Sequence, residues 1–326
     1  MEPGRWVDRV SSGRLETPMN RCLLSLCALT LFACQTTVAD ERPTPDDRIS
    51  TVAIDMEQVT TIKPGLNHLY FEGWGEIRLP VWVYVPTSVE AREAPVLFMM
   101  HGAKRGAARY LSEWDQIAER QGFIVVAPEF TRNAFPGSAG YNLGNRIPRG
   151  VETVIEEAAW TFSAIEPLFD YVVERLGGSQ TDYTIYGHSA GSQFTHRFMY
   201  FKPEARAKRF LAANAGWYTF PDLEVDYPVG LGGLALSDDD LKRYLEKDLV
   251  ILIGDQDNDP THESLKRDDG VDQQGPHRFA RGQNFFEKGR AEAERVGAQF
   301  GWQLRIVEGV AHSNGGMAAA AADLVE

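Results

Sequence analysis

A serine, an aspartate and a histidine occur in this chain in an order that could support nucleophilic catalysis. Ser189 is the middle residue of GHSAG at 187–191, Asp257 lies in GDQDNDP at 254–260, and His312 lies near the C-terminal end. A serine hydroxyl is a weak nucleophile at neutral pH and needs a base within hydrogen-bonding distance. Histidine can accept that proton and return it, and a carboxylate can fix the tautomer of the imidazole. The three residue types together predict attack by a serine on a carbonyl group.

Each of the three residues follows an apolar stretch that is typical of a β-strand. These stretches lie at 183–187, 248–254 and 300–309, and further strands are expected at 76–86, 95–102, 123–130 and 210–218. Helices are expected between them, at 107–121 and 160–176. Strands that alternate with long helices indicate a mostly parallel sheet, which binds its ligand at the carboxyl ends of the strands. We therefore expect the serine, the aspartate and the histidine to meet at that edge of the sheet.

This arrangement resembles the α/β-hydrolase superfamily over roughly 65–326. The resemblance is carried by a Gly-x-Ser-x-Gly turn between a strand and a helix, by the preceding His101-Gly102, and by the order serine, aspartate, histidine. It implies an α/β-hydrolase fold, with a mostly parallel central sheet flanked by helices and a short cap inserted at about 219–247. The HGA sequence at 101–103 and the short cap look similar to those of secreted esterases of the polyhydroxyalkanoate-depolymerase and feruloyl-esterase-like type.

The resemblance also implies roles for individual residues. Ser189, Asp257 and His312 would form the catalytic triad. The backbone N–H groups of Ala190 and of Ala103, or of Lys104 in place of Ala103, would form the oxyanion hole.

Three aspartates compete for the acidic position of that triad. The superfamily often places the acid three residues after the glycine that ends the strand, which favours Asp257. Asp255 lies very close to the end of the strand, and Asp259 precedes a proline, which restricts it to an extended conformation. Asp257 is the expected acid, with Asp259 left as the alternative.

Substrate contacts are less clearly marked in the sequence. Trp217 and Tyr218 follow a predicted strand and could line the acyl or alcohol site. Lys104 and Arg105 could attract an anionic substrate, although a solvated loop is the more ordinary interpretation of two adjacent basic residues. We expect no cofactor and no metal: GDQDNDP resembles the start of a calcium loop, but the turn glycine is missing and Lys266 replaces the closing glutamate.

The N-terminal 39 residues are expected to lie outside the fold. Met19 is the better initiator, and an apolar run at 22–34 suits a signal peptide and is too short to span a bilayer as a helix. The run ends in LFAC, which resembles a lipobox and would place a lipid on Cys34, whereas TVA at 37–39 suits cleavage without a lipid. Either route predicts a bacterial protein that is periplasmic, anchored to the outer membrane or extracellular. Residues 40–64 are expected to form a linker, followed by one domain at 65–326.

Charge and cysteine content exclude other classes of function. The formal net charge of −13 argues against a nucleic-acid partner, which requires clustered lysine and arginine. All three cysteines lie in the N-terminal leader, so the predicted domain has neither a disulfide nor a thiol nucleophile. The expected partner is a small-molecule or polymeric ester.

The preferred function is therefore that of an exported serine hydrolase that cleaves ester bonds through an acyl-enzyme. Two alternatives remain. One is a dienelactone-hydrolase-like or peptidase activity on the same scaffold, because the fold alone does not determine the substrate. The other is an envelope binding protein that has lost catalysis.

Overall fold

One eight-stranded sheet organises the residues that the computed structural model describes, 61–146 and 155–325. The strand order is β1-β2-β4-β3-β5-β6-β7-β8. Strand β2 runs antiparallel to β1 and β4, and the other neighbours are parallel. The predicted mostly parallel sheet is confirmed. The predicted signal peptide, Cys34 and most of the predicted linker lie outside the described residues.

Every predicted stretch overlaps a strand or helix of the structure, whereas the first strand and the last four α-helices were not predicted. The strands are β1 (Gly65–Phe71), β2 (Leu79–Val85), β3 (Val96–Met100), β4 (Ile124–Pro128), β5 (Tyr183–His188), β6 (Ala207–Ala213), β7 (Leu249–Gly254) and β8 (Gln303–Val307). The α-helices are α2 (Ala107–Leu111), α3 (Asp115–Gln121), α4 (Ile165–Leu176), α5 (Ala190–Phe201), α6 (Asp238–Leu245), α7 (Asp269–Asp272), α8 (Arg278–Val296) and α9 (Asn314–Ala321). Short 3-10 helices are η1 (Glu157–Ala159), η2 (Thr161–Ala164) and η3 (Ala322–Leu324). No helix among the described residues is long and apolar enough to cross a membrane.

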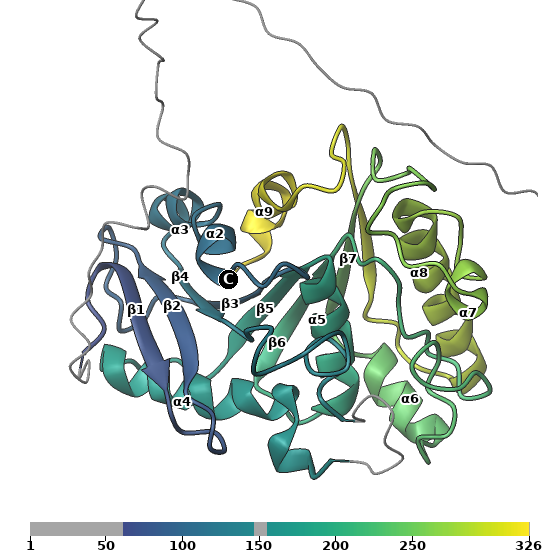
Figure 1. The fold of residues 1–326 in the computed structure, drawn as a ribbon, viewed down its shortest axis with the longest axis horizontal. Helices are drawn as coiled ribbons and strands as arrows, with labels where there is room; N and C mark the ends of the chain where they lie inside the picture. The colour runs from purple at the N-terminus through teal and green to yellow at the C-terminus, as the bar shows by residue number, and fades with distance from the viewer. Residues whose placement is uncertain (1–60, 147–154, 326) are drawn as a thin grey trace, which may run out of the picture. The chain divides into compact units, whose positions relative to one another are not determined.

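Helices cover both faces of the sheet (Figure 1). Helices α2, α3 and α9 pack on one face, and α4, α5, α6 and α8 pack on the other. Every residue of β3, β4, β5 and β7 is buried, as the continuous apolar runs predicted. Strand β2 alternates instead, with its valines in the core under α4 and α5 and Trp82 and Tyr84 on the opposite face.

The stretch predicted as one helix at 107–121 is divided into α2 and α3. Between them the chain turns so that Trp114 becomes fully buried. Its ring packs edge-on against Phe123 and Tyr186, which ties the helix pair to the sheet. The burial of one large aromatic residue therefore takes precedence over a continuous helix.

The segment predicted as a short cap, 219–247, contains a loop and a helix. The loop contacts the region around α5, where the Tyr227 hydroxyl donates to the Leu143 carbonyl oxygen at 3.2 Å. Helix α6 then begins with a capping box of Ser237 and Asp240, and it leads into the amino end of β7. Its buried residues Leu241 and Leu245 belong to the core beneath α5 and α8.

Three histidines are almost completely buried near the carboxyl ends of the strands: His101, His188 and His196. The Nε2 atom of His101 accepts the Phe130 N–H at 3.1 Å, and that of His196 accepts the Thr219 N–H at 3.0 Å. Burial lowers the pKa of His101 to about 3, and it lowers the pKa values of His188 and His196 well below the ordinary range. All three side chains are therefore neutral in the folded protein at physiological pH.

We predict that the protein loses stability as the pH falls from 7 to 5. In the unfolded chain the three imidazoles titrate near pH 6.5, so the unfolded state binds more protons than the folded state over this range. Each buried histidine then removes about 2 kcal/mol from the free energy of unfolding between pH 7 and 5. Urea unfolding followed by tryptophan fluorescence at several pH values measures this slope. The variant His196→Gln should reduce the slope by about a third, and an unchanged slope would contradict the explanation.

Candidate active site

Ser189 lies at a sharp turn between β5 and α5. Its backbone has φ 58° and ψ −114°, a conformation that residues other than glycine rarely adopt. The Ser189 N–H donates to the Ala213 carbonyl oxygen at the end of β6, at 3.0 Å, which holds the turn in place. The strained turn directs the serine side chain out of the sheet at the carboxyl ends of the strands.

The glycines on either side of Ser189 are required by close backbone contacts. A Cβ atom on Gly187 would collide with the Gly191 carbonyl, and one on Gly191 would collide with the carbonyl groups of Met100 and His101. The start of α5 therefore packs directly against the end of β3. This contact explains in physical terms why the turn has the pattern Gly-x-Ser-x-Gly.

His312 lies between Ser189 and Asp257 and contacts both. Its Nε2 atom is 3.0 Å from Ser189 Oγ, and its Nδ1 atom is 2.7 Å from Asp257 Oδ2. Because a carboxylate can only accept, the short contact places the imidazole proton on Nδ1. Nε2 is then left to accept the serine hydroxyl proton. The structure thus brings together the three residues predicted as a triad, from the segments that follow β5, β7 and β8.

Asp257 is buried, with only 4% of its surface exposed. Its second oxygen, Oδ1, faces Nη1 of Arg278 at 3.3 Å, and Arg278 is itself 2% exposed. The Arg278 Nη2 group donates to Ser264 Oγ at 2.9 Å, which orients the guanidinium. Arg278 was not predicted from the sequence, because it is the first residue of α8 and no motif connects it with the loop after β7.

The other two aspartates of this loop are engaged elsewhere. Asp255 Oδ1 accepts the Gly309 N–H at 2.8 Å, and Asp259 Oδ1 accepts from the N–H and hydroxyl groups of Thr261, each at 2.7 Å. Asp259 is exposed, and its hydrogen bonds to Thr261 lower the pKa of its carboxyl. Of the three carboxylates, Asp257 is the one that contacts His312.

The two residues predicted for the oxyanion hole come from different segments of the chain. Ala190 is the first residue of α5, and Ala103 lies in the exposed loop after β3. Within the described part of the chain, neither N–H group donates a hydrogen bond to the protein. The loop of Ala103 is braced beneath by the Tyr141 hydroxyl, which donates to the His101 carbonyl oxygen at 2.8 Å. The role of both N–H groups in catalysis stays a prediction.

The two aromatic residues predicted to line the substrate site are enclosed by protein groups. Trp217 is 3% exposed, and the cations of Arg197 and Lys266 lie 4.2 and 4.4 Å from its ring. Tyr218 has no exposed surface, and its ring stacks on Phe285 with the ring centres 4.4 Å apart. Because its surface is covered, Tyr218 is a core residue in this structure rather than the wall of an open pocket.

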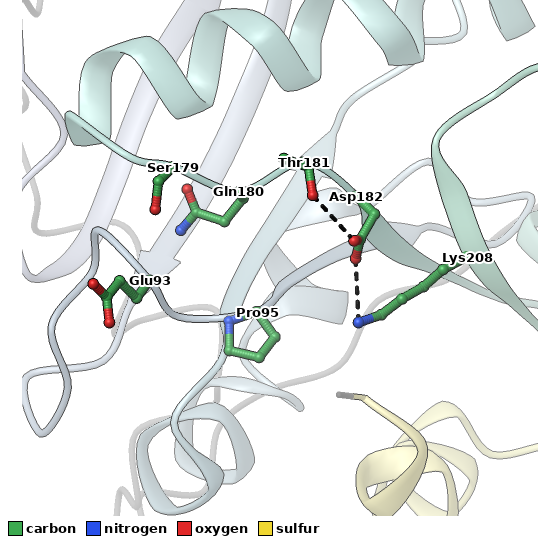
Figure 2. A pocket seen from close by; sticks show the side chains of 7 residues that line it. All are labelled: Glu93, Pro95, Ser179, Gln180, Thr181, Asp182 and Lys208. Atoms are coloured by element: carbon green, nitrogen blue, oxygen red, sulfur yellow. Dashed lines mark hydrogen bonds and ion pairs between the residues drawn. The ribbon is translucent and has the colours of Figure 1, made fainter.

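Two cavities lie at opposite ends of the sheet. One, of about 300 Å³, adjoins the loop of Ala103 at the carboxyl ends of the strands. The other, of about 210 Å³, lies beside Pro95, Asp182 and Lys208, where β3, β5 and β6 begin. Figure 2 shows that Lys208 in this second cavity points at Asp182, with which it forms an ion pair at 3.2 Å. The first cavity is the better candidate for substrate, because parallel sheets bind ligands at the carboxyl ends of their strands.

The described residues include no cluster of three or more histidine, cysteine, aspartate or glutamate side chains that could hold a metal ion. Beside the proposed triad, the buried His188 places its ring centre 4.6 Å from that of His312. Its Nδ1 atom is 3.1 Å from the Tyr110 hydroxyl. His188 therefore contributes packing and a neutral surface to the site.

Comparison with protein-family models gave no match, and comparison with curated proteins gave none either. Solved structures are similar to this chain. Poly(aspartic acid) hydrolase-1 from Sphingomonas sp. KT-1 is 41% identical with a TM-score of 0.78, over 81% of this chain and 99% of that one. The poly(3-hydroxybutyrate) depolymerase LpqC from Bordetella parapertussis is 32% identical with a TM-score of 0.75, over 80% of this chain and 89% of that one.

An S-formylglutathione hydrolase from Agrobacterium tumefaciens shares the fold, with 17% identity and a TM-score of 0.50 over 79% of this chain and 91% of that one. The first two relatives combine identity above 30% with nearly complete coverage of their own chains. Together with the sheet order and the strand–turn–helix at Ser189, they establish the family. The chain belongs to the α/β-hydrolase superfamily of serine hydrolases.

Proposed function

We propose that this protein is an exported esterase in which Ser189 forms an acyl-enzyme with the substrate. The observation that carries the proposal is the continuous line of hydrogen bonds from Ser189 Oγ through His312 to Asp257. This arrangement supplies a nucleophile, a base and a group that orients the base, which are the parts that acyl transfer needs. The similarity to two hydrolases, one of which acts on a polyester, supports an ester as the substrate.

The reaction begins with attack by Ser189 Oγ on the ester carbonyl carbon, while the hydroxyl proton moves to His312 Nε2. The carbonyl oxygen becomes an oxyanion, which the N–H groups of Ala190 and Ala103 would stabilise. The bond to the alcohol oxygen then breaks, and His312 returns its proton to that oxygen. An acyl ester on Ser189 remains. Water, deprotonated by His312, attacks this ester. The bond to Ser189 Oγ then breaks, His312 returns its proton to Oγ, and the carboxylic acid and the free serine are released.

Asp257 keeps His312 in the tautomer that the first step requires and stabilises the imidazolium that forms. Arg278 holds the opposite oxygen of the same carboxylate. With one oxygen held by His312 and the other by Arg278, the Asp257 carboxylate is fixed in one orientation. The same groups would serve the second half of the reaction, because deacylation repeats the proton transfer with water in place of serine.

A second candidate function is hydrolysis of amide bonds. The relative with 41% identity is a poly(aspartic acid) hydrolase, and its polymer is joined by amide bonds. The same nucleophile and base can cleave an amide, provided that His312 protonates the leaving nitrogen. Assays of 4-nitrophenyl esters of varied chain length, poly(3-hydroxybutyrate) and poly(aspartic acid) separate the two functions. The hydrogen bonds that join Ser189, His312 and Asp257 disfavour the other alternative, a binding protein without catalysis.

We predict that a fluorophosphonate probe labels the purified protein at Ser189. The variant Ser189→Ala should lose both the label and at least about 10³-fold of the turnover of a 4-nitrophenyl ester, because no other group can form the acyl-enzyme. The variant His312→Ala should lose a similar factor, and the double variant should be no worse than either single variant. Turnover at the wild-type rate in Ser189→Ala would exclude the mechanism.

The choice among the three aspartates can be tested by conservative substitution. The variant Asp257→Asn should reduce kcat by about 10⁴-fold, because an amide no longer favours the required tautomer of His312. It should also lose stability, because Arg278 is then buried without its carboxylate, so circular dichroism must show that the variant is folded before kcat is compared. The matched variants Asp255→Asn and Asp259→Asn should stay within a fewfold of wild-type kcat, since neither side chain contacts His312. A large loss in Asp259→Asn with little loss in Asp257→Asn would assign the acid to the alternative residue.

Export is proposed from the predicted leader. Metabolic labelling with a palmitate analogue should mark the protein if Cys34 is lipidated, and the variant Cys34→Ser should abolish the mark. Mass spectrometry of the mature N-terminus provides the second measurement: a start at Asp40 without lipid indicates ordinary secretion. An intact N-terminal leader on protein recovered from the cytoplasm would contradict both routes.

A further inference from the structure

The cavity beside the loop of Ala103 is lined by basic side chains and by no acidic ones. Its walls are formed by Ala103, Arg105, Arg132, Pro136, Gly137, Ser138 and Asn142. Two of these residues are arginines and none is acidic. In a chain with 46 acidic and 33 basic residues, a cavity lined by arginine without carboxylate differs from the average surface. The difference occurs at the end of the sheet where the proposed nucleophile lies.

Arg105 contributes charge to this cavity from a buried position. It is 7% exposed, and its guanidinium donates to the carbonyl oxygens of Phe130, Phe135 and Gly137 at 2.5, 3.0 and 2.8 Å. It forms no ion pair with any other described residue. The solvated loop expected from the sequence is therefore wrong for Arg105. A buried cation that contacts carbonyl dipoles and the ring of Tyr141 but no carboxylate leaves a positive potential in the adjoining space.

Arg132 supplies the N–H groups that can reach a ligand. Its side chain is exposed, and its Nη2 group donates to the Ala103 carbonyl oxygen at 3.1 Å. No ion pair to Arg132 occurs within the described residues. Burial lowers the pKa of the Arg105 guanidinium, and the positive charge of Arg132 contributes in the same direction, so the two cations are close enough to repel each other. An anion in the cavity would relieve that repulsion.

Two residues that line the cavity, Ala103 and Asn142, also make contacts toward the proposed reaction centre. Ala103, whose N–H is the proposed oxyanion donor, forms one wall and is the residue that Arg132 contacts. Asn142 forms another wall, and its amide donates to Gln193 Oε1 at 2.8 Å. Gln193 lies in the first turn of α5, where its N–H donates to the Ser189 carbonyl oxygen at 3.1 Å. The walls of the cavity are thus tied by hydrogen bonds to the segment that carries Ser189.

We propose that this cavity binds a free carboxylate of the substrate, with Arg132 as the direct partner. The proposal rests on the proposed function and narrows it to esters, or polymers, whose acyl or alcohol part carries a carboxylate near the bond that is cleaved. A planar guanidinium can hold a carboxylate by two parallel hydrogen bonds. The hydroxyl of Ser138, which forms no hydrogen bond to the described residues, can donate a third. The buried Arg105 adds attraction without a direct contact.

A matched pair of substrates tests the proposal. Mono-4-nitrophenyl esters of dicarboxylic acids from glutarate to suberate carry a free carboxylate, and their methyl esters differ only in lacking that charge. The quantity measured is the ratio of kcat/KM for the acid to that for its methyl ester, after subtraction of spontaneous hydrolysis. For the wild-type protein this ratio should exceed one at one or more chain lengths. In Arg132→Gln the ratio should fall about tenfold, the effect of one charge-assisted contact.

Two further variants serve as controls. Arg132→Glu should lower the ratio further than Arg132→Gln, because it places a like charge beside the carboxylate. Arg120→Gln removes the same charge from an exposed position on α3 away from the cavity, and it should leave the ratio within twofold of wild type. High salt should lower the wild-type ratio and have little effect on that of Arg132→Gln.

The outcomes separate the carboxylate site from the proposed function. A wild-type ratio of one or less at every chain length would overturn the carboxylate site. Equal losses for acid and methyl ester in Arg132→Gln would also overturn it, because they would show a disturbance of the Ala103 loop. If Ser189→Ala retained wild-type turnover of the methyl esters, the acyl-enzyme itself would be excluded. If Ser189→Ala lost turnover and the ratios followed the expected order, both proposals would stand.

Discussion

The close contact between the start of α5 and the end of β3 is the constraint on which the site depends. There is no room for a side chain at Gly187 or Gly191, because the carbonyl groups of the neighbouring backbone occupy that space. The turn between them can only be made by a residue with positive φ, and that residue is Ser189. Such a conformation costs on the order of 1–3 kcal/mol, and it persists because the Ala213 carbonyl and the packed helix hold it. The packing of α5 against β3 therefore determines where the Ser189 side chain points.

The second feature of the site is the buried ion pair of Asp257 and Arg278. Asp257 and Arg278 are both nearly inaccessible to solvent, and each would be costly to bury alone. Their contact, together with the hydrogen bonds to His312 and Ser264, compensates both groups. Such a pair contributes little to stability compared with apolar side chains of the same size, so its value lies in a fixed orientation of the carboxylate. That orientation is what the imidazole of His312 requires.

The loop after β3 is supported by a different set of interactions. Arg105 ties this loop to the segment after β4 through three carbonyl oxygens, and its guanidinium also lies 4.3 Å from the centre of the Tyr141 ring. His101, neutral because it is buried, joins the same two segments through the Phe130 N–H. Loops are ordinarily the more mobile parts of a fold, but this loop is hydrogen-bonded to the segment after β4 by the side chains of Arg105 and His101. The proposed oxyanion donor Ala103 is therefore carried by a well-supported backbone.

The sequence alone determined most of the architecture, because strand burial and the glycines of the turn are local properties. Continuous apolar runs identified β3, β4, β5 and β7, alternation identified β2, and the turn identified Ser189. The division of α2 from α3 and the burial of Tyr218 were not predictable, because both depend on which side chains fill the core from distant segments. The same holds for Arg278 and Arg105, whose partners lie 14 to 32 residues away in the chain. The periodicity of the sequence shows which face of a strand or helix is apolar. Only tertiary packing decides which charged side chains come into contact, and which, like Arg132, have no carboxylate partner among the described residues.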